Sequence, residues 1–127
     1  MNQQELIIRP ARVTDAMGIK NLIDAAAAKD EVLPRTTGEV FSRIREFLVA
    51  EAPGEGVVGC AALRVFSSDL AEVRSLVVSP EFRSHRLGVR LTQAVIEDAR
   101  KLEVARVFAL TSIPKFFSKL GFTEVPK

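Results

Sequence analysis

The stretch that decides the fold runs from Glu72 to Leu91 and reads E-V-R-S-L-V-V-S-P-E-F-R-S-H-R-L-G-V-R-L. An apolar run at its start is followed by a turn rich in basic residues, and this turn leads into an amphipathic segment. The first turn of a helix leaves its backbone N–H groups without partners, and the aligned peptide dipoles favour negative charge there. The stretch therefore predicts an anion site suited to a phosphate, surrounded by the basic side chains Arg83, His85, Arg86 and Arg90.

The residues after this turn complete a crossover unit. Apolar residues recur at helical spacing from residue 86 to residue 102, which predicts a helix with one face packed on a sheet. Residues 104–110 follow as a further buried strand. A strand over residues 70–78, this helix and a parallel neighbouring strand form a unit whose ligand lies at the carboxyl end of the first strand. We therefore expect the anion site at the end of the strand over residues 70–78.

Apolar periodicity and turn residues predict the remaining elements. The Pro-Gly-Glu-Gly segment at residues 53–56 is typical of a hairpin turn, and the strands on either side of it form an antiparallel meander with the strand over residues 70–78. Thr14 and Asp15 offer an N-cap for the first helix, and Gly121 is expected to cap the last one. The predicted strands are at 6–9, 47–52 and 57–66, and the predicted helices are at 14–28, 37–47 and 114–120.

The composition fits a soluble domain with a single core. The chain has 127 residues, of which 47% are apolar and 27% charged. No apolar run reaches the roughly 20 residues that cross a bilayer, and the N-terminus has no signal-peptide core, so a cytoplasmic protein without membrane contact is expected. A formal charge of +2 with neither Trp nor Tyr argues against nucleic acid as a partner. Cys60, the sole cysteine, excludes an intrachain disulfide and is expected to be a buried structural thiol.

Residues 78–88, V-x-P-x-x-R-S-H-R-L-G, resemble the acetyl-coenzyme A signature of the GNAT N-acetyltransferases, whose pattern is Q/R-x-x-G-x-G/A. The chain keeps the first and last elements as Arg83 and Gly88, but it has Arg86 where the family has a glycine. Other segments are similar to the family as a whole, namely I-R-P-A at 8–11, E-V-R-S-L at 72–76, L-T-S-I at 110–113 and F-F-S-K-L-G-F at 116–122. A narrower resemblance, to N-acetylglutamate synthase and its short single-domain relatives, lies in L-P-R at 33–35, R-S-L at 74–76 and F-F-S-K-L-G-F at 116–122.

The resemblance implies a single GNAT domain over residues 1–127, with an α/β fold in which helices cover both faces of a twisted mixed sheet. Members of the family usually end with two strands after the last helix, yet only residues 122–127 follow it here. The last strand is therefore expected to be missing, and either the chain is a truncation, or the edge is completed by a neighbouring molecule, or the edge is left open. An open sheet edge would favour self-association, for example as a homodimer.

The resemblance also implies that acetyl-CoA is the cosubstrate and that no metal takes part. By motif position, its pantetheine arm would bind the backbone of Leu76, Val77 and Val78, which can at the same time pack as a core strand. Arg86 either adds a charge-assisted contact to the pyrophosphate or crowds it, and Gly88 gives the phosphate close access to the backbone. The residues expected to hold the phosphates are Arg83, Ser84, His85, Arg86, Leu87, Gly88 and Val89. His85 is expected to contact phosphate or solvent and not to act as the base.

Direct acetyl transfer needs a deprotonated amine, donors for the developing oxyanion and a proton for the departing thiolate. Glu72, at the start of the signature strand, is the candidate base, and a solvated glutamate at a strand end is the alternative interpretation. Many GNAT enzymes carry a tyrosine in the short helix before L-G-F, but this chain has no tyrosine and Phe117 stands there. The proton must therefore come from water, from the ammonium product, or from a hydroxyl such as Ser112 or Ser118.

The acceptor implied by the narrower resemblance is the α-amino group of glutamate or a similar amino acid, as in arginine biosynthesis. Arginine suits such an acceptor because its planar fork binds a carboxylate through two hydrogen bonds. Arg35 and Arg74 are the candidates, and two surface arginines without a role are the alternative. The alternative functions are a noncatalytic CoA-binding or regulatory GNAT-like module, and an acetyltransferase for peptide N-termini, polyamines or drug-like amines.

Overall fold

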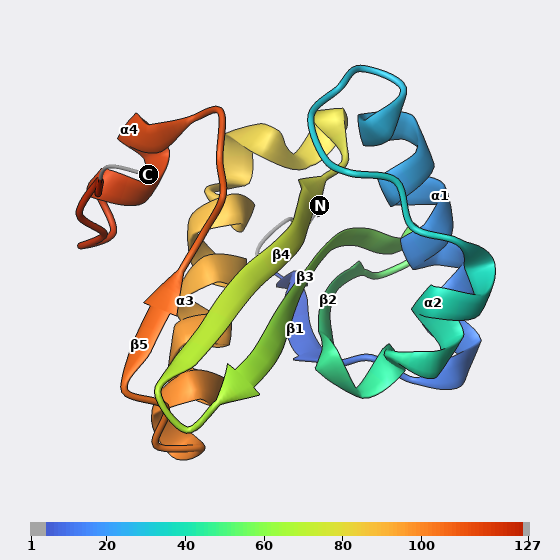
Figure 1. Cartoon of the computed structure of the whole chain (residues 1–127). Coiled ribbons are helices and arrows are strands. Elements are labelled where there is room, and N and C mark those ends of the chain that lie inside the picture. Colours follow the sequence, from blue (N-terminus) through green and yellow to red (C-terminus); the bar gives the residue numbers. More distant parts are fainter. Residues whose placement is uncertain (1–4, 126–127) are drawn as a thin grey trace.

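Over residues 5–125, which the computed structural model describes, five strands form a sheet that lies between helices (Figure 1). The strands lie side by side in chain order, with the first four antiparallel and the last two parallel. They are β1 (Ile7–Pro10), β2 (Phe47–Ala52), β3 (Gly56–Ser67), β4 (Leu70–Val78) and β5 (Arg106–Phe108). The helices are α1 (Ala16–Ala27), α2 (Thr37–Ser42), α3 (Leu87–Lys101) and α4 (Pro114–Ser118), with 3-10 turns at Val13–Asp15, Ile44–Glu46 and Pro80–His85.

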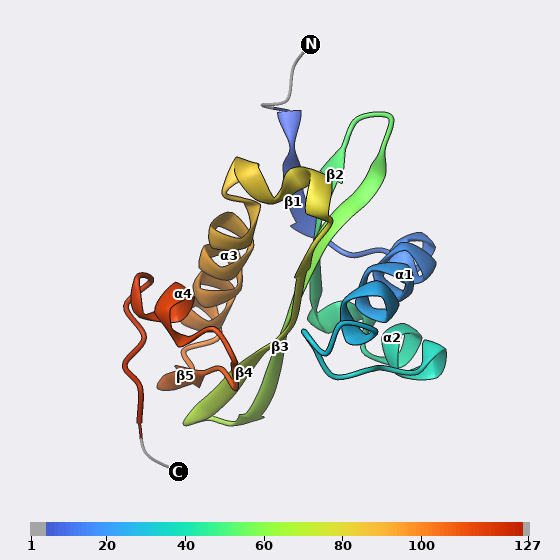
Figure 2. The ribbon, with the colours of Figure 1, turned by 90° about the horizontal axis from the view of Figure 1, so that it is seen from above.

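Helices cover both faces of the sheet. α1 and α2 lie on one face, and α3 and α4 lie on the other (Figure 2). Ile19 and Ile23 of α1 are fully buried on the first face beside Phe47. Leu87 and Leu91 of α3 are fully buried on the second face. The three-layer α/β/α arrangement expected from the sequence is confirmed.

The helix predicted over residues 37–47 is wrong in its second half, because α2 ends at Ser42. Its start is well defined, since Thr36 Oγ1 accepts from the Glu39 backbone N–H and Glu39 Oε1 accepts from the Thr36 backbone N–H. Phe47 is only 1% exposed and is the first residue of β2. Pairing with β3 therefore outweighs the helical spacing of the apolar residues.

Asp15 has a different role from the predicted helix cap. It precedes α1 but makes no side-chain cap bond to that helix. Its Oδ2 accepts from the Arg12 backbone N–H at 2.7 Å, and both carboxylate oxygens accept from the Arg9 guanidinium. The hydrogen bonds from Arg9 lower the pKa of Asp15. The carboxylate therefore ties β1 to the start of α1.

The parallel pairing between β4 and β5 is short. A strand over residues 104–110 was expected from the apolar run, but β5 covers only Arg106–Phe108, opposite Leu70–Glu72 of β4. Within the described residues, β4 is paired with β3 alone from Val73 onward. One edge of β4 is therefore without a strand neighbour along most of its length.

A β-bulge in β4 lies just beyond the end of this pairing. Ser75 and Leu76 together oppose the single residue Ala61 of β3. Ser75 has a φ of 54°, in the left-handed region that residues other than glycine rarely adopt. A bulge bends its strand and increases the local twist. The bulge therefore bends β4 at the place where β5 no longer accompanies it.

α4 ends at Ser118, two residues before the predicted end, and a turn at residues 119–121 follows it and closes at Gly121. Gly121 has a φ of 96°, its N–H donates to the Ser118 carbonyl, and the Phe122 N–H donates to the Phe117 carbonyl. The Phe117 and Phe122 rings meet edge to face with their centroids 5.2 Å apart. Residues 122–125 form no strand, so β5 is an edge of the sheet in the part of the chain that the structure describes.

Candidate active site

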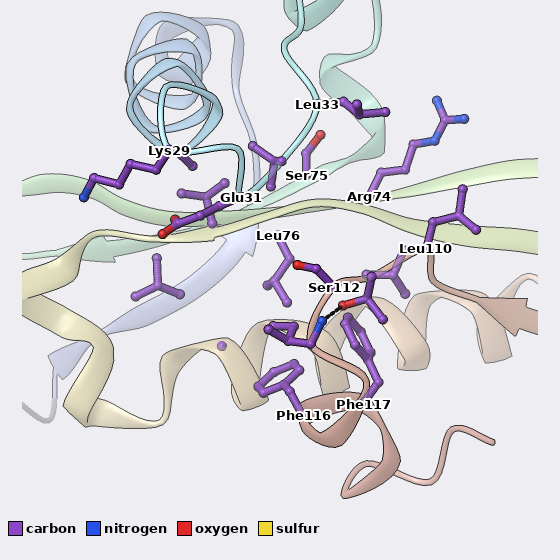
Figure 3. A pocket seen from close by; sticks show the side chains of 18 of the residues that line it. Lys29, Glu31, Leu33, Arg74, Ser75, Leu76, Leu110, Ser112, Phe116 and Phe117 are labelled. Carbon is purple, nitrogen blue, oxygen red and sulfur yellow. Dashed lines mark hydrogen bonds between the residues drawn. The ribbon is translucent and has the colours of Figure 1, made fainter. Parts of the chain in front are cut away.

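A cavity of about 890 Å³ lies beside the free edge of β4. Its walls are β4 itself, the loop over residues 29–35 that follows α1, the start of α3, and the segment over residues 110–117 that leads into α4 (Figure 3). The cavity therefore extends along β4 from Glu72 to Val78 and includes the carboxyl end of the strand, where the sequence predicts the ligand.

Three consecutive residues of β4 form the middle of the cavity. Leu76, Val77 and Val78 all line it. Their side chains alternate, with Val77 buried in the core under α1 and the other two packed toward the core under α3. Because the β4 edge that faces away from β3 has no strand neighbour here, an extended ligand can lie along it as an added strand.

Arg86 adopts the conformation that explains the glycine of the family signature. It links the turn at Pro80–His85 to α3 with a φ of 56° and a ψ of 29°, which is left-handed. This conformation costs a residue other than glycine about 1–2 kcal/mol. The Arg86 side chain is exposed and lines the cavity. The departure from the signature therefore has a backbone cost.

Gly88 leaves space that the ligand can use. A Cβ at this position would stand 3.5 Å from Phe116 Cζ and 3.9 Å from Val78 Cγ2, which are ordinary van der Waals distances. Packing within the protein therefore does not require glycine at position 88. The absent side chain instead widens the cavity at the start of α3.

The predicted phosphate residues fall into two groups. Arg83, Arg86, Gly88 and Val89 line the cavity, whereas the side chains of Ser84, His85 and Leu87 do not. Leu87 is fully buried in the core, and the His85 ring packs on Phe82 with centroids 5.5 Å apart. Arg90, which the sequence places near the turn, donates to the Leu6 carbonyl and is also absent from the cavity.

Arg83 connects the mouth of the cavity to the loop after α1. Its Nε donates to the Val78 carbonyl at 3.3 Å, and its Nη2 lies 3.3 Å from Glu31 Oε1. The Arg83 and Glu31 side chains are 51% and 41% exposed, so this ion pair is weak and competes with solvent. Arg83 is therefore available to a phosphate that arrives at the mouth.

Glu72 and Arg74 form a close ion pair at the other end of the cavity. Both residues line it, and Arg74 Nε donates to Glu72 Oε1 at 2.6 Å. Glu72 is 5% exposed, so the alternative of a solvated glutamate at a strand end is wrong. Arg74 also lies over the Phe66 ring, 5.6 Å from its centroid. This end of the cavity therefore contains a buried carboxylate held by a cation.

Arg35 is buried and incompletely bonded. It is 8% exposed, its Nη1 donates to Ser75 Oγ at 2.8 Å, and its guanidinium lies over the Phe47 ring. Its Nη2 is buried without a hydrogen-bond partner in the part of the chain that the structure describes. Burial, together with the nearby positive charge of Arg64, lowers the pKa of Arg35. The alternative of a surface arginine is wrong for this residue.

The carboxylates near Arg35 are engaged elsewhere. Glu39 accepts from the Thr36 backbone, Glu46 pairs with Arg43 and Arg64, and Glu72 pairs with Arg74. Leaving a buried donor unsatisfied costs about 1–3 kcal/mol. Arg35 thus forms no ion pair within the described residues, although the charges of Glu39 and Glu46 partly oppose the lowering of its pKa, and its free Nη2 belongs to a residue that lines the cavity.

The two serine candidates for the proton donor differ in position. Ser112 is exposed and lines the cavity (Figure 3). Ser118 does not line it, and its hydroxyl donates to the Lys115 carbonyl. Phe117, which stands where a tyrosine is expected in the family, is buried and lines the cavity with its ring. Ser112 is therefore the better placed of the two hydroxyls.

Ser75 is the residue of this site that the sequence reasoning missed. It lines the cavity, forms the bulge in β4 and holds Arg35, yet nothing in the R-S-L segment indicates a left-handed serine. The Arg35–Ser75 contact joins residues 40 positions apart. Only the register between β3 and β4 reveals this role.

Comparison with known proteins places the chain in a family. Residues 43–124 match the family described as "Acetyltransferase (GNAT) domain". An amino-acid acetyltransferase of Mycobacterium tuberculosis is 39% identical over 94% of this chain and 69% of its own length. An uncharacterized N-acetyltransferase of Chlorobaculum tepidum is 33% identical over 100% of this chain and 81% of its own length. The chain belongs to the GNAT acetyltransferases.

Solved structures agree with this assignment. A Mycobacterium tuberculosis protein crystallised with CoA superposes with a TM-score of 0.89 at 38% identity, covering 94% of this chain and 73% of that one. N-acetylglutamate synthase of Neisseria gonorrhoeae, complexed with coenzyme A and N-acetyl-glutamate, gives a TM-score of 0.91 at 31% identity. The match covers 98% of this chain but only 30% of the synthase.

The protein is an acetyl-CoA-dependent N-acetyltransferase, and its donor end fits that cosubstrate. The free edge of β4 can pair with the pantetheine arm, Gly88 leaves room at the start of α3, and Arg83 and Arg86 bring positive charge to the mouth. Among the described residues, no group of three or more His, Cys, Asp and Glu side chains could hold a metal ion. No helix in that part of the chain is long and apolar enough to cross a membrane.

Proposed function

We propose that this enzyme acetylates the α-amino group of an acidic amino acid, with glutamate as the preferred acceptor. The observation that carries the proposal is the buried Arg35 guanidinium, whose Nη2 has no partner among the described residues although it belongs to a cavity-lining side chain. A carboxylate of the acceptor would satisfy this donor and balance its charge. The match to a synthase crystallised with N-acetyl-glutamate supports the same acceptor, which would serve arginine biosynthesis.

Arg35 and Arg74 divide the recognition of the two carboxylates. Arg35 binds one carboxylate through its free Nη2, which is buried in this structure and reaches the ligand after a small rotation of the guanidinium. Arg74 uses its Nε for Glu72, and its terminal nitrogens, which have no hydrogen-bond partner in the described part of the chain, are available to the other. Hydrogen bonds between charged groups in a buried site are about twice as strong as neutral ones. An acceptor with two carboxylates is therefore expected to bind more tightly than an acceptor with one.

Glu72 acts as the base in this proposal. Arg74 holds its Oε1 at the cavity wall, and its Oε2 takes part in no hydrogen bond within the described residues. Oε2 removes a proton from the acceptor ammonium, directly or through a water molecule. The resulting amine then has the lone pair that attack on a carbonyl carbon requires.

The donor end positions the acetyl group for direct attack. Bound acetyl-CoA supplies an activated thioester carbonyl. The backbone of Leu76 to Val78 aligns the arm, and Arg83 and Arg86 with the first turn of α3 hold the phosphates. A C–N bond forms as the C–S bond breaks, and Ser112 or a water molecule gives the departing sulfur its proton. No covalent enzyme intermediate is needed.

The test is a survey of acceptors with the purified chain and acetyl-CoA. Release of the CoA thiol and the mass of the product are measured with glutamate, aspartate, glutamine, spermidine and a short peptide. Glutamate is expected to give the highest kcat/KM, with N-acetylglutamate as product. Preference for spermidine or the peptide would overturn the acceptor, and calorimetric binding of acetyl-CoA without turnover of any amine would identify a noncatalytic module.

Three further expectations remain predictions. The single domain over residues 1–127, the cytoplasmic location and the homodimer are each open to measurement. Limited proteolysis, cell fractionation and sedimentation of the purified chain would test them in turn. A homodimer that uses the β5 edge is expected to dissociate when Val107 is replaced by proline, because proline removes a backbone donor.

A further inference from the structure

Ser75 contacts Arg35 on the cavity side and Cys60 of β3 in the core. Its hydroxyl accepts a hydrogen bond from Arg35 Nη1 at 2.8 Å, at the acceptor end. Its carbonyl accepts from Cys60 Sγ at 3.3 Å, which holds the bulge against β3. The next residue in the chain is Leu76, the first of the three that present the β4 backbone to the donor. Ser75 thus contacts the arginine proposed to bind the acceptor, and it directly precedes the part of β4 proposed to bind the donor.

The partner of Arg35 is a neutral hydroxyl, and this has a chemical consequence. A carboxylate in the place of Ser75 Oγ would neutralise the guanidinium and compete with an incoming anion. The hydroxyl fixes the orientation of the guanidinium but leaves its charge available. The Phe47 ring on which the guanidinium lies is likewise uncharged. The hydroxyl and the ring therefore orient the Arg35 guanidinium without neutralising its positive charge.

The conformation of Ser75 makes this orientation dependent on the bulge. A φ of 54° is sparsely populated for serine and persists only where the surroundings impose it. Cys60, the β3 pairing and Arg35 are the contacts that impose it here. The direction of the Oγ, and with it the position of Arg35 Nη2, is consequently set by the same bulge that bends β4.

We propose that Ser75 is a positioning residue that sets the specificity for the acceptor: its hydroxyl aims Arg35 at the carboxylate of the amino acid, in register with the donor on β4. The proposal rests on the proposed function, since it takes Arg35 as the carboxylate ligand. It assigns to Ser75 no contact with the reacting atoms.

Two substitutions separate the hydroxyl from the backbone. Ser75→Ala removes the hydroxyl and keeps a Cβ in the left-handed conformation, whereas Ser75→Gly removes the hydroxyl and relieves the conformation. Both are expected to raise the KM for glutamate about tenfold, equivalent to about 1.4 kcal/mol, while the KM for acetyl-CoA changes less than twofold. Ser67→Ala is the matched control, because the Ser67 hydroxyl accepts from the Asp69 backbone in the exposed β3–β4 turn and does not line the cavity.

The outcomes distinguish the possible roles. A raised KM for glutamate in both variants supports the proposal, provided that kcat/KM falls less for a monocarboxylic amino acid than for glutamate. Recovery of the wild-type KM in Ser75→Gly alone would overturn it, because the role would then belong to the backbone. An equal rise in the KM values of glutamate and acetyl-CoA would also overturn it, as general damage to β4.

A binding measurement keeps this inference separate from the proposed function. If the wild type acetylates no amino acid, the proposed function fails. Glutarate, a dicarboxylate without an amine, is then titrated into the CoA-bound protein while the side-chain NMR signal of Arg35 is followed. A shift in the wild type that is lost in Ser75→Ala supports the positioning role, and an equal response in the two proteins contradicts it.

Discussion

Arg83 and Arg35 both line the cavity, and they are the same residue type in opposite surroundings. Arg83 is half exposed and shares an ion pair with Glu31, so solvent screens its charge and each partner is easily exchanged. Arg35 is 8% exposed and has a hydroxyl in place of an anion. A charge in a poorly solvated site interacts more strongly with a ligand than the same charge at the surface.

The comparison teaches that the two ends of the site are built differently. The donor end relies on backbone edges, the start of α3 and exposed cations, so we expect it to tolerate single substitutions. The acceptor end relies on a few buried side chains whose partners are each specified. Substitutions are therefore expected to have large effects at the acceptor end and modest ones at the donor end.

The largest effect is expected from Glu72→Gln. The amide keeps the shape of the side chain but cannot take a proton, so kcat with glutamate should fall about 100-fold or more. Steady-state kinetics at neutral and low pH measure this, with Glu97→Gln on the exposed face of α3 as the control. A normal rate at both pH values would remove Glu72 from the mechanism.

Arg35→Met is expected to act in opposite directions on affinity and stability. Loss of the carboxylate ligand should raise the KM for glutamate by a factor of about 10 to 100. Removal of a buried charge that lacks an anionic partner should raise the free energy of unfolding by about 1 kcal/mol. Arg45→Met, at an exposed position, should change neither quantity. An unchanged KM for glutamate would exclude Arg35 from the acceptor site.

At the donor end, Arg83→Ala should weaken acetyl-CoA binding only about threefold to tenfold, because the cation is exposed and Arg86 remains beside it. The loss should shrink as salt is added. The matched variant Glu31→Gln removes the competing anion and should leave binding equal or slightly tighter. Calorimetric titration of both variants tests the point, and weaker binding in Glu31→Gln would show that the ion pair supports the site.

Arg86→Gly separates a backbone effect from a ligand effect. Glycine relieves the left-handed conformation, and the free energy of unfolding should rise by about 1 kcal/mol. If Arg86 contacts the phosphates, acetyl-CoA should bind more weakly in the variant, and if it crowds them, more tightly. Thermal denaturation and calorimetry measure the two quantities. Unchanged affinity would mean that neither effect operates.

The smallest effect is expected at Cys60, which lies under the bulge and is fully buried. Burial raises the pKa of its thiol from 9.0 to about 12. Because the folded-state value is the higher one, its contribution to stability is present below pH 9 and is lost as the pH rises toward 12. The native chain should not react with a thiol reagent at pH 8, whereas the denatured chain should react once. Rapid reaction of the native chain would contradict the burial.

Some elements could be predicted closely and others could not. The strand over residues 70–78 has the predicted bounds, and α3 lies within one residue at each end of the predicted helix, because both combine a strong apolar pattern with clear turn signals. The helix predicted over residues 37–47 included the first residue of β2, and the strand predicted over residues 104–110 was longer than β5. In both cases the pairing with a distant strand decided the bounds.

The candidate site divides in the same way. The signature around residues 83–88 located the donor end, since its chemistry depends on a turn and a helix start that lie close together in sequence. The exclusion of Ser84, His85 and Leu87 from the cavity depended on how the turn packs. At the acceptor end, the sequence named Glu72, Arg35 and Arg74 but did not show their burial or their partners.

The sequence alone determined the fold class, the crossover unit and the acetyl-CoA signature, because each rests on contacts between near neighbours in the chain. Only the tertiary structure decided that Arg86 is left-handed, that Ser75 forms a bulge and that Arg35 is buried with no hydrogen-bond partner for its Nη2 among the described residues. These features arise from strand register and from contacts between segments far apart in sequence. Local patterns carry no information about such contacts, since each segment alone would be solvated.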